Sequence, residues 1–421
     1  MVDVLDDLQW RGLLGQSTDE AALRSALGQP LTFYVGFDPT APSLHIGHLV
    51  QILVARRLQR AGHHPLLLVG GATGLIGDPK PTAERQLNDA QVVAGWVERL
   101  RAQIEPYVEL EGPNPARMVN NLDWTSQLSA LDLLRDVGRH FRVGRMLAKE
   151  AVAARMASDE GISYTEFSYQ VLQAMDYLEL HRRHGCTLQF GGSDQWGNVS
   201  AGVDLVHRVE RTAVHGFTVP LLTKADGTKF GKTESGTVWV DPALTSPYAF
   251  HQFWLNVEDA SVDRYLRVLT DRSPAELEAL AGRTAERPGA REAQRTLARD
   301  VTSLVHGEDA VEAAEAAAAA LFGRGDLRAL PEDVLQAAVA ELPRAVVGEG
   351  SRTVVELLVA TGLSPSRSAA RRAVADGGAY VNNVAVADGD AELVDDQLLH
   401  GRWALVRRGK RTLAAVDGRP R

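Results

Sequence analysis

The alternation of apolar and polar positions over residues 31–71 predicts a strand, a helix and a second strand. Residues 31–38 (LTFYVGFD) are rich in β-branched and aromatic side chains, and a loop containing Pro39 and Pro42 follows them. From residue 45 onward apolar positions recur every three or four residues, which is the period of an α-helix. Residues 64–71 (HPLLLVGG) predict a second, fully buried strand. A βαβ unit at this spacing indicates a parallel sheet.

Further along the chain the pattern changes from mixed to helical. Residues 163–180 predict a helix, and 187–190 predict a short strand that ends in two glycines. From about 245 to 322 the pattern is almost wholly helical, and the alanine-rich stretch 309–322 has very high helix propensity. Glycines and prolines then punctuate a region that predicts a linker with one short helix. We predict an α/β domain over 1–224, an α-helical domain over 225–330, a linker over 331–350 and a small α+β domain over 351–421.

Composition excludes several classes of protein. The chain has 421 residues, of which 45% are hydrophobic and 24% charged, too apolar for disorder as the main state. The single cysteine, Cys186, rules out a disulfide framework and fits a reducing cytoplasm. No apolar run approaches the ~20 residues needed to span a bilayer. The first ten residues contain three aspartates and no basic residue, which is not typical of a secretory signal.

The charge distribution sets the last block apart from the rest. Lys and Arg number 45 against 54 Asp and Glu, so the formal net charge is −9. Residues 351–421 hold 11 basic and 8 acidic residues, a charge of +3, so the remainder carries −12. A solvated surface explains either basic cluster alone, but two clusters in one small block favour an RNA-binding module. The candidate RNA-binding residues are Arg367, Arg371, Arg372, Arg407, Arg408 and Lys410.

The first candidate chemical site is Thr40 with the sequence His-Ile-Gly-His at 45–48. Free N–H groups at a helix start attract anions such as phosphate, and Gly47 allows a ligand to approach the backbone. His45 and His48 are three residues apart, so both can face one crevice. Histidines at a helix start are also common as structural or exposed residues. Metal ligation lacks a third His or Cys at a suitable spacing nearby.

The second candidate site is the sequence Lys-Phe-Gly-Lys-Thr at 229–233. Two lysines and a threonine on a loop that contains glycine can bind a polyphosphate. Flanking glycines at 227, 231 and 236 predict mobility of this loop. The alternative interpretation is an ordinary solvated basic loop.

Two further candidate sites follow from the spacing of polar residues. Tyr169, Gln173 and Asp176 lie four and three residues apart, so they share one face of the predicted helix 163–180. Leaving such groups buried and unpaired costs about 1–3 kcal/mol each, so this face either is solvated or lines a pocket. Residues 191–198 (GGSDQWGN) follow a strand and precede a helix, where open α/β sheets bind ligands. Asp194 there is suited to hold the hydroxyl pair of a ribose.

These elements together, in this order, resemble a known enzyme family. The sequences at 45–48 and 229–233 resemble the two signature sequences of class I aminoacyl-tRNA synthetases. Tyr34, the face formed by residues 169, 173 and 176, and residues 191–195 narrow the match. The chain resembles the bacterial tyrosyl-tRNA synthetases over essentially its whole length. The resemblance implies a Rossmann-like parallel-sheet catalytic domain, then an α-helical tRNA-facing domain and a small ribosomal-protein-like RNA-binding domain.

The resemblance implies a role for each motif position. It places the pyrophosphate side of ATP at Thr40 and His45, with Lys229, Lys232 and Thr233 closing over it. It places the rest of ATP at Gly36, Asp38, Gly47, His48, Gly192 and Asp194. It places the tyrosine phenol at Tyr34 and Asp176, and the ammonium group at Asp78, Tyr169 and Gln173, with Gln195 nearby.

The reaction and its partners are implied in the same way. Tyrosine condenses with ATP to give tyrosyl-adenylate and pyrophosphate, and the tyrosyl group then passes to the 3′ end of tRNA(Tyr). Mg²⁺ accompanies ATP, held mainly by phosphate oxygens, with no tightly bound protein metal. We expect a cytoplasmic homodimer with no membrane partner. Phenylalanine is rejected because it leaves buried polar groups unsatisfied; these synthetases are the standard example of that effect, at about 10⁵-fold without editing, so we expect no editing domain.

One segment departs from the family pattern. The lysine after the Gly-Asp-Pro at 77–79 comes early, as Lys80, so either Lys80 or Arg85 takes the pyrophosphate-binding role.

Three other functions fit part of the sequence pattern. A tryptophanyl-type synthetase shares the fold and both signatures but normally lacks the terminal module. A small nucleotidyltransferase does not explain the 229–233 loop. A non-catalytic RNA-binding paralogue is disfavoured because both histidines and both loop lysines are present.

Overall fold

The computed structural model describes residues 3–80, 87–159, 161–223, 227–228, 230–233, 236–346 and 353–418, with the backbone alone at 150, 151, 232 and 233. The chain forms two compact units. Unit 1 comprises residues 1–241 and 260–278, and unit 2 comprises residues 242–259 and 279–421. The finer division at 224, 330 and 350 stays a prediction.

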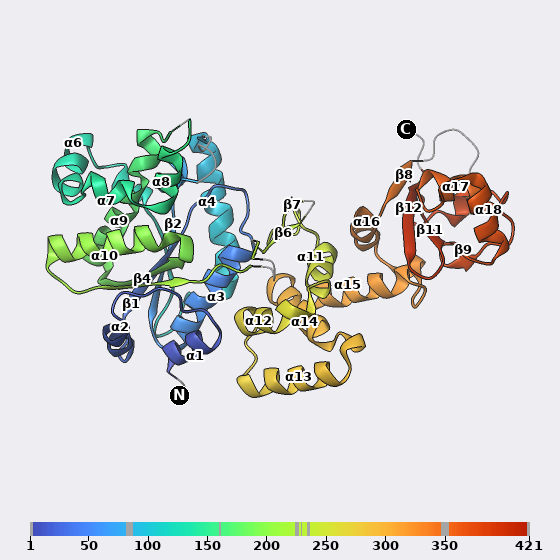
Figure 1. Cartoon of the computed structure of the whole chain (residues 1–421), viewed down its shortest axis with the longest axis horizontal. Helices are drawn as coiled ribbons and strands as arrows, with labels where there is room; N and C mark the ends of the chain where they lie inside the picture. Colours follow the sequence, from blue (N-terminus) through green and yellow to red (C-terminus); the bar gives the residue numbers. More distant parts are fainter. Residues whose placement is uncertain are drawn as a thin grey trace. The chain divides into compact units, whose positions relative to one another are not determined.

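Unit 1 is built on a five-stranded sheet in the order β3-β2-β1-β4-β5 (Figure 1). Its strands are β1 (Thr32–Phe37), β2 (His64–Val69), β3 (Arg117–Asn120), β4 (Cys186–Gly192) and β5 (His215–Val219). Every neighbouring pair is parallel. The predicted α/β fold with a parallel sheet is therefore confirmed, and the two glycines at 191 and 192 lie within β4 rather than after it.

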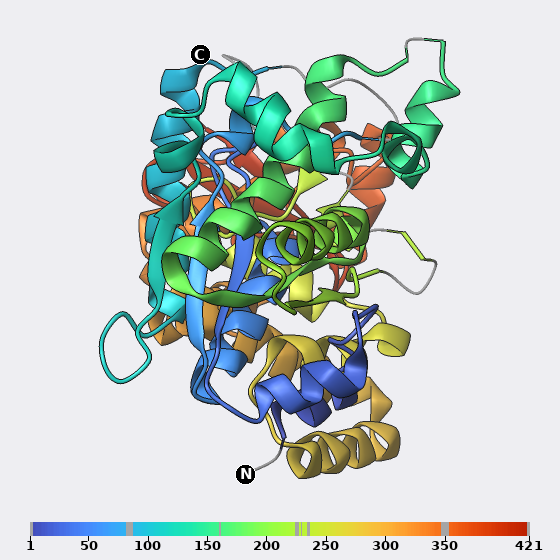
Figure 2. The same cartoon turned by 90° about the vertical axis from the view of Figure 1, so that its left-hand side faces the viewer.

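Helices cover both faces of this sheet because each carries an apolar stripe. The longer helices of the unit as a whole are α1 (Val4–Trp10), α2 (Glu20–Leu27), α3 (Ile46–Arg60), α4 (Ala90–Ile104), α9 (Tyr164–His184), α10 (Trp196–Glu210) and α12 (Asp259–Leu269), the last of which lies away from the sheet in Figure 1. Short helices α5 (Leu122–Thr125), α6 (Ala130–Asp132), α7 (Val143–Leu147) and α8 (Glu150–Met156) precede α9. In Figure 2 the green helices α9 and α10 lie in front of the blue strands.

The ends of α9 illustrate why this sequence is helical. The Ser163 side chain accepts a hydrogen bond from the backbone N–H of Glu166, which caps the first turn. Gly185 ends the helix in the left-handed conformation, with φ of 63°. Between the caps, Met175 and Leu178 are buried with Leu66 and Leu68 of β2 in one apolar cluster. The helix therefore presents a fixed face to the sheet.

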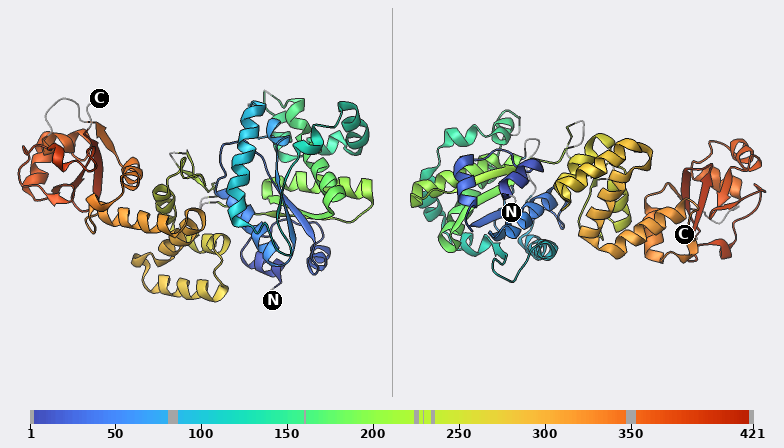
Figure 3. Two further views of the ribbon diagram at one scale, coloured as in Figure 1. Left: turned by 180° about the vertical axis from the view of Figure 1, so that it is seen from behind. Right: turned by 90° about the horizontal axis from the view of Figure 1, so that it is seen from below.

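Unit 2 combines helices with a second, mixed sheet. The helices are α11 (Pro247–Leu255), α14 (Glu292–His306), α15 (Glu308–Leu321), α16 (Glu332–Ala340), α17 (Val354–Ala360) and α18 (Arg367–Ala375); α13 (Pro274–Glu286) crosses the boundary between the units. The strands are β8 (Arg344–Val346), β9 (Ala379–Val381), β10 (Val384–Ala385), β11 (Trp403–Arg408) and β12 (Thr412–Asp417), in the order β10-β9-β11-β12-β8. Figure 3 shows these helices and strands, coloured from yellow to red, from two further sides.

The hairpin of β11 and β12 is buried on both faces. Ala404 and Val406 share an apolar cluster with α17 and α18. Trp403 and Leu405 point the other way, because side chains alternate along a strand, and share a cluster with α15 and α16. The region predicted as a linker thus contains α16, which is the expected short helix, and also β8, which pairs in parallel with β12.

Candidate active site

The sheet of unit 1 reverses its strand order between β1 and β4. From this point β2 and β3 extend to one side and β5 to the other. Open parallel sheets bind ligands in the crevice at the carboxyl ends of the two strands that flank such a point. The loop after β1 carries Asp38 and Thr40, and the turn after β4 carries Asp194 and Gln195. These four predicted site residues therefore follow neighbouring strands at one edge of the sheet.

The first signature sequence forms the start of α3. His45 is the N-cap residue, and its Nδ1 accepts a hydrogen bond from the backbone N–H of Gly47 at 3.1 Å. His48 Nδ1 accepts from the backbone N–H of His45 at 3.3 Å. The two imidazoles stack with centroids 3.9 Å apart and an angle of 6° between their planes. Because Nδ1 is an acceptor in both rings, Nε2 is the nitrogen that carries the proton.

Burial keeps the second imidazole neutral. Desolvation, with a smaller contribution from His45, lowers the pKa of His48 well below its ordinary value. A Cβ at Gly47 would lie 2.9 Å from His45 Cε1, so only glycine leaves room for the stacked rings. The His48 imidazole is therefore a rigidly held, uncharged donor near a helix N-terminus.

The second signature sequence lies against the first. A Cβ at Gly231 would lie 3.6 Å from the Cβ of Ile46. The segment beyond it is fixed by two backbone bonds, from Val238 N–H to Gly231 O and from Val240 N–H to Leu44 O, both 2.9 Å. Lys232 and Thr233 form β6 (Lys232–Thr233), which pairs with β7 (Gly236–Thr237). Lys229 lies outside the described residues, as do the side chains of Lys232 and Thr233.

A chain of hydrogen bonds connects the end of β1 to α9. Tyr169 Oη donates to Asp38 Oδ2, and Thr73 Oγ1 donates to Asp38 Oδ1, both at 2.6 Å. Asn121 Nδ2 donates to Thr73 Oγ1 and to Asp176 Oδ2, both at 2.9 Å. The predicted ATP-binding aspartate and the predicted tyrosine-binding aspartate are therefore linked through Thr73 and Asn121.

Asp176 and Tyr34 occupy a buried environment. The Asp176 side chain is 2% exposed and accepts hydrogen bonds from Asn121 and from Trp124 Nε1, the latter at 2.8 Å. Burial raises the pKa of Asp176 to about 7, although the two donors partly offset this. Burial and the nearby Asp176 charge raise the pKa of Tyr34 well above its ordinary value. The Tyr34 hydroxyl is fully buried and bonds to none of the described residues.

Asp78 stands at the centre of a second polar cluster. It accepts from Gln195 Nε2 at 2.8 Å, from Asn198 Nδ2 at 3.2 Å and from Lys149 Nζ at 3.4 Å. The structure thus brings together Asp78 and Gln195, as predicted. Gln173 contributes a buried Oε1 that no described residue satisfies. The carboxylate is held in place and the amide is free to accept a donor.

The remaining positions predicted to bind ATP differ in their exposure and contacts. Gly36 is exposed although it lies within β1. Asp194 is exposed, and a Cβ at Gly192 would lie 2.6 Å from Asp194 Oδ1. Thr40 donates its backbone N–H to Asp38 O at 2.8 Å. Of the two alternatives beyond Gly77, Lys80 is exposed and Arg85 lies outside the described residues.

Sequence reasoning missed several residues of this site. They are Thr73, Asn121, Trp124, Lys149, Gln189 and Asn198. Asn121 and Trp124 follow β3, whose four residues are too few to show a strand period. Gln189 pairs with Tyr34 across β4 and β1, and its Oε1 is buried without a described partner. A polar residue inside a buried strand was the signal available for it.

Of the six predicted RNA-binding residues, four have side chains with a hydrogen bond or ring contact to another described residue, and two have neither. Arg367 bonds to Glu356 at 2.9 Å, and Arg371 bonds to both oxygens of Asp390 at 2.8 and 3.0 Å. Arg407 lies 4.0 Å over the Tyr380 ring, and Arg408 donates to Leu363 O. Arg372 and Lys410 are exposed and bond to none of the described residues.

Comparison with family models defines the class of the protein. A model described as tRNA synthetases class I (W and Y) matches residues 26–323. A second model, described as Tyrosine--tRNA ligase SYY-like C-terminal domain, matches residues 333–416. The first match covers more than half of the chain, so the class is that of the class I tRNA synthetases.

Curated relatives make the assignment more specific. The chain is 63% identical over 422 residues to a Tyrosine--tRNA ligase of Streptomyces griseus, covering 100% of both chains. It is 54% identical to that of Corynebacterium glutamicum over 99% of both. The chain belongs to the bacterial-type tyrosyl-tRNA synthetases. The predicted activity, ligation of tyrosine to tRNA, is thereby confirmed.

Solved structures agree on the fold. A C-terminally truncated mitochondrial tyrosyl-tRNA synthetase of Aspergillus nidulans superposes with a TM-score of 0.67 at 29% identity, covering 75% of this chain and 92% of that one. A tryptophanyl-tRNA synthetase of Encephalitozoon cuniculi, 14% identical with a TM-score of 0.54, shares the fold alone. Among the described residues, no helix has both the length and the apolar character to cross a bilayer.

Proposed function

We propose that this chain activates L-tyrosine with ATP and transfers it to tRNA(Tyr) by using the residues gathered at the β1–β4 edge. One observation carries the assignment of the amino-acid pocket. The hydroxyl of Tyr34 is buried with no described partner, and the buried carboxylate of Asp176 is near enough for its charge to raise the pKa of Tyr34. Unsatisfied buried polar groups are rare unless a ligand completes them. A substrate phenol offers both a donor and an acceptor on one oxygen, so it can complete both groups.

In this pocket the substrate phenol donates to Asp176 and accepts from Tyr34. Each Asp176 oxygen already accepts one hydrogen bond, from Asn121 or Trp124, and has a second lone pair for the substrate. Phenylalanine would leave both groups unsatisfied. Its rejection therefore follows from desolvation and needs no editing step.

The substrate ammonium group lies toward Asp78, Tyr169 and Gln173. Gln173 offers a buried, unsatisfied Oε1 as acceptor. The Tyr169 hydroxyl donates to Asp38, which leaves its oxygen free to accept a proton donor. Asp78 adds negative charge, and its bonds to Gln195 and Asn198 fix its orientation.

The triphosphate lies over the start of α3. The Nε2–H groups of His45 and His48, the helix N-terminus and Thr40 supply donors where charge develops on the departing pyrophosphate. Lys229, Lys232 and Thr233 act from the adjacent signature loop, whose central Gly231 borders Ile46. Asp194, beside Gly192, receives the ribose hydroxyls, and Gly36 and Asp38 line the nucleotide side. The rate acceleration comes from positioning and charge stabilisation, with no covalent bond to the protein.

Magnesium is expected to reach the site with ATP. The described residues contain no group of three His, Cys, Asp or Glu side chains arranged around one ion position. The described side chains therefore fit an ion that is held by phosphate oxygens and neutralises part of the phosphate charge. Lys80 or Arg85 is the cationic residue assigned to the pyrophosphate on the segment beyond Gly77.

The proposed RNA interface is the last module, and the proposed assembly is a cytoplasmic homodimer. Exposed apolar side chains concentrate between β3 and α9, which supports a protein interface there. They include Leu131 (76% exposed), Leu134 (56%), Val143 (60%) and Tyr164 (71%). We expect Leu131→Asp to convert the dimer into monomers in sedimentation velocity. Val384→Asp, at a 69% exposed position of β10, is the control. A monomeric wild-type chain contradicts this assembly.

Amino-acid-dependent exchange of pyrophosphate into ATP tests the proposed reaction. We expect exchange with tyrosine, and not with tryptophan or phenylalanine, followed by charging of tRNA(Tyr). His45→Ala should lower the exchange rate about tenfold to a hundredfold with little change in tyrosine affinity, because a charge-stabilising donor is lost. A loss of tyrosine binding instead would refute the pyrophosphate role of His45.

A further inference from the structure

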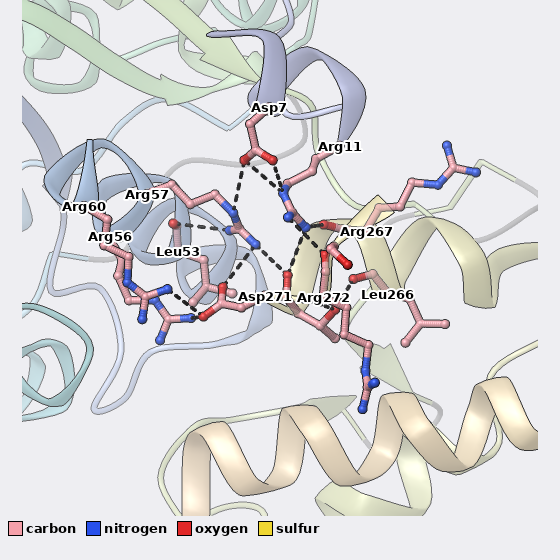
Figure 4. A network of polar contacts seen from close by, with 12 residues as sticks. Asp7, Arg11, Leu53, Arg56, Arg57, Arg60, Leu266, Arg267, Asp271 and Arg272 are labelled. Atoms are coloured by element: carbon pink, nitrogen blue, oxygen red, sulfur yellow. Dashed lines mark hydrogen bonds and ion pairs between the residues drawn. The ribbon is translucent and has the colours of Figure 1, made fainter. Parts of the chain in front are cut away.

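Helix α12 is anchored by two buried arginines at its C-terminal end (Figure 4). Arg11 donates to the carbonyl oxygens of Arg267 at 2.8 Å, Thr270 at 3.0 Å and Arg272 at 3.2 Å. Arg57 donates to the same Thr270 oxygen at 2.7 Å. Both guanidinium groups are only 7% exposed. They satisfy carbonyl groups that every helix C-terminus leaves without partners.

The same network fixes α12 to α3, the helix that begins with the first signature. Arg56 and Arg60 of α3 donate to Asp271 Oδ2 at 2.7 and 2.8 Å. Burial alone would raise the pKa of Asp271, but the surrounding arginines lower it below its ordinary value. Burial, and then Arg11, lower the pKa of Arg57 to about 10. The Asp271 carboxylate and the Arg57 guanidinium therefore remain charged and paired at neutral pH.

The middle of α12 contacts the second signature and the segment before it. Tyr265, 1% exposed, donates its hydroxyl to the carbonyl oxygen of Thr223 at 2.9 Å. Its ring packs on Phe230 with centroids 4.2 Å apart. Arg264 donates to Thr223 Oγ1 at 3.1 Å and to Leu221 O at 3.2 Å. Thr223 precedes the predicted phosphate-binding loop and Phe230 belongs to it.

Tyr265 thus contacts the chain at two points, Thr223 before the 229–233 sequence and Phe230 within it. The Phe230 N–H also donates to Leu222 O at 2.9 Å, so the segment before the sequence lies beside Phe230, which packs on Tyr265. The next residue, Gly231, has φ of 86° and borders Ile46 of the first signature. A displacement of Tyr265 would therefore move the second signature, at Phe230, relative to the first, at Ile46.

We propose that Tyr265 is a positioning residue for adenylate formation. It touches no substrate; it holds Phe230 of the 229–233 sequence, and Thr223 before it, at a fixed place on α12, whose far end is fixed to α3. This inference rests on the proposed function, because it assumes that the lysines of that sequence act on the pyrophosphate. It assigns a role in the transition state and none in tyrosine binding, which uses Tyr34 and Asp176.

The test compares two substitutions that remove different contacts. Tyr265→Phe deletes only the bond to Thr223 O, and we expect kcat of tyrosine-dependent pyrophosphate exchange to fall about fivefold, the value of one net hydrogen bond. Tyr265→Leu deletes the ring contact as well, and we expect a fall of about 30-fold. The dissociation constant of tyrosine, measured by equilibrium dialysis without ATP, should stay within about twofold of wild type in both.

A matched control removes a similar bond elsewhere. Thr361 Oγ1 donates to Leu357 O at 2.7 Å within α17 of unit 2, and Thr361→Val should leave exchange unchanged. Wild-type kcat in Tyr265→Phe would overturn the inference, as would a parallel loss of tyrosine affinity, which indicates general destabilisation. If Tyr265→Leu does not fold, Tyr265→Phe decides. Absence of tyrosine-dependent exchange in wild type would instead defeat the proposed function, and the inference with it.

Discussion

At the scale of single residues, the buried carboxyl of Asp176 has the most informative environment. Two donors, Asn121 and Trp124, hold it in place, yet burial raises its pKa to about 7. The free protein therefore holds this group partly protonated at neutral pH. A substrate phenol that donates to Asp176 binds better to the carboxylate, because hydrogen bonds to charged acceptors are stronger.

Tyrosine affinity should therefore depend on pH through Asp176. As the pH falls through about 7 the carboxyl takes up a proton, so binding must expel that proton and weakens. We expect the dissociation constant of tyrosine to rise between pH 8 and pH 6, by at most about tenfold per unit. Asp176→Asn should abolish this slope and raise the constant about 10- to 100-fold at pH 8, since a charged hydrogen-bond partner is lost. A wild-type profile that is flat over this range contradicts the assignment.

At the scale of elements, the turn after β2 depends on a glycine. A Cβ at Gly70 would overlap Asp38 Oδ1 and Thr73 Oγ1, which share the hydrogen bond that begins the chain to Asp176. We expect Gly70→Ala to separate this pair, to lower the free energy of unfolding by about 1–3 kcal/mol and to slow exchange.

Gly95 provides the control for this substitution. It lies inside α4, where a Cβ would meet nothing within 4 Å. Gly95→Ala should leave exchange unchanged and increase stability by about 0.5–1 kcal/mol, because alanine favours the helix. Denaturant unfolding and exchange rates measure both variants. Equal stability of Gly70→Ala and wild type would show that the turn tolerates a side chain.

The elements also show how far the sequence alone could be interpreted. Apolar periodicity predicted 31–38, 64–71 and 163–180 within a few residues of β1, β2 and α9, because each buries a regular stripe. It did not predict β8, whose three residues are fixed by pairing with β12 about 70 residues later. Asn121 and Trp124 were missed for a similar reason, since only the folded sheet brings them to Asp176. The roles of the signature residues came from family resemblance and stay predictions.

At the scale of the whole molecule, charge pairing separates the basic residues of the last module. Arg367 and Arg371 are engaged with Glu356 and Asp390, whereas Arg372 and Lys410 are exposed and bond to no described residue. Basic residues already paired with carboxylates must lose those partners before they neutralise phosphate. Arg372 and Lys410 are thus the stronger candidates for contact with RNA.

We predict that Arg372→Glu combined with Lys410→Glu raises KM for tRNA in charging, by about tenfold at low salt. The salt dependence of KM should become shallower, because fewer phosphate contacts release counterions. Pyrophosphate exchange, which needs no tRNA, should be unaffected. Arg99→Glu, at an exposed position of α4, is the control of equal charge type. Charging by the double variant that equals wild type at every salt concentration would remove these residues from the interface.

Amino-acid selectivity in pyrophosphate exchange bears most directly on the pocket formed around Tyr34. The decisive quantity is kcat/KM for tyrosine divided by kcat/KM for phenylalanine, measured for wild type and for Tyr34→Phe. We predict strong tyrosine selectivity in wild type and a ratio about fivefold to tenfold lower in Tyr34→Phe, since one buried partner of the phenol is gone. Wild-type exchange that is as efficient with phenylalanine, or an unchanged ratio in Tyr34→Phe, would contradict that pocket.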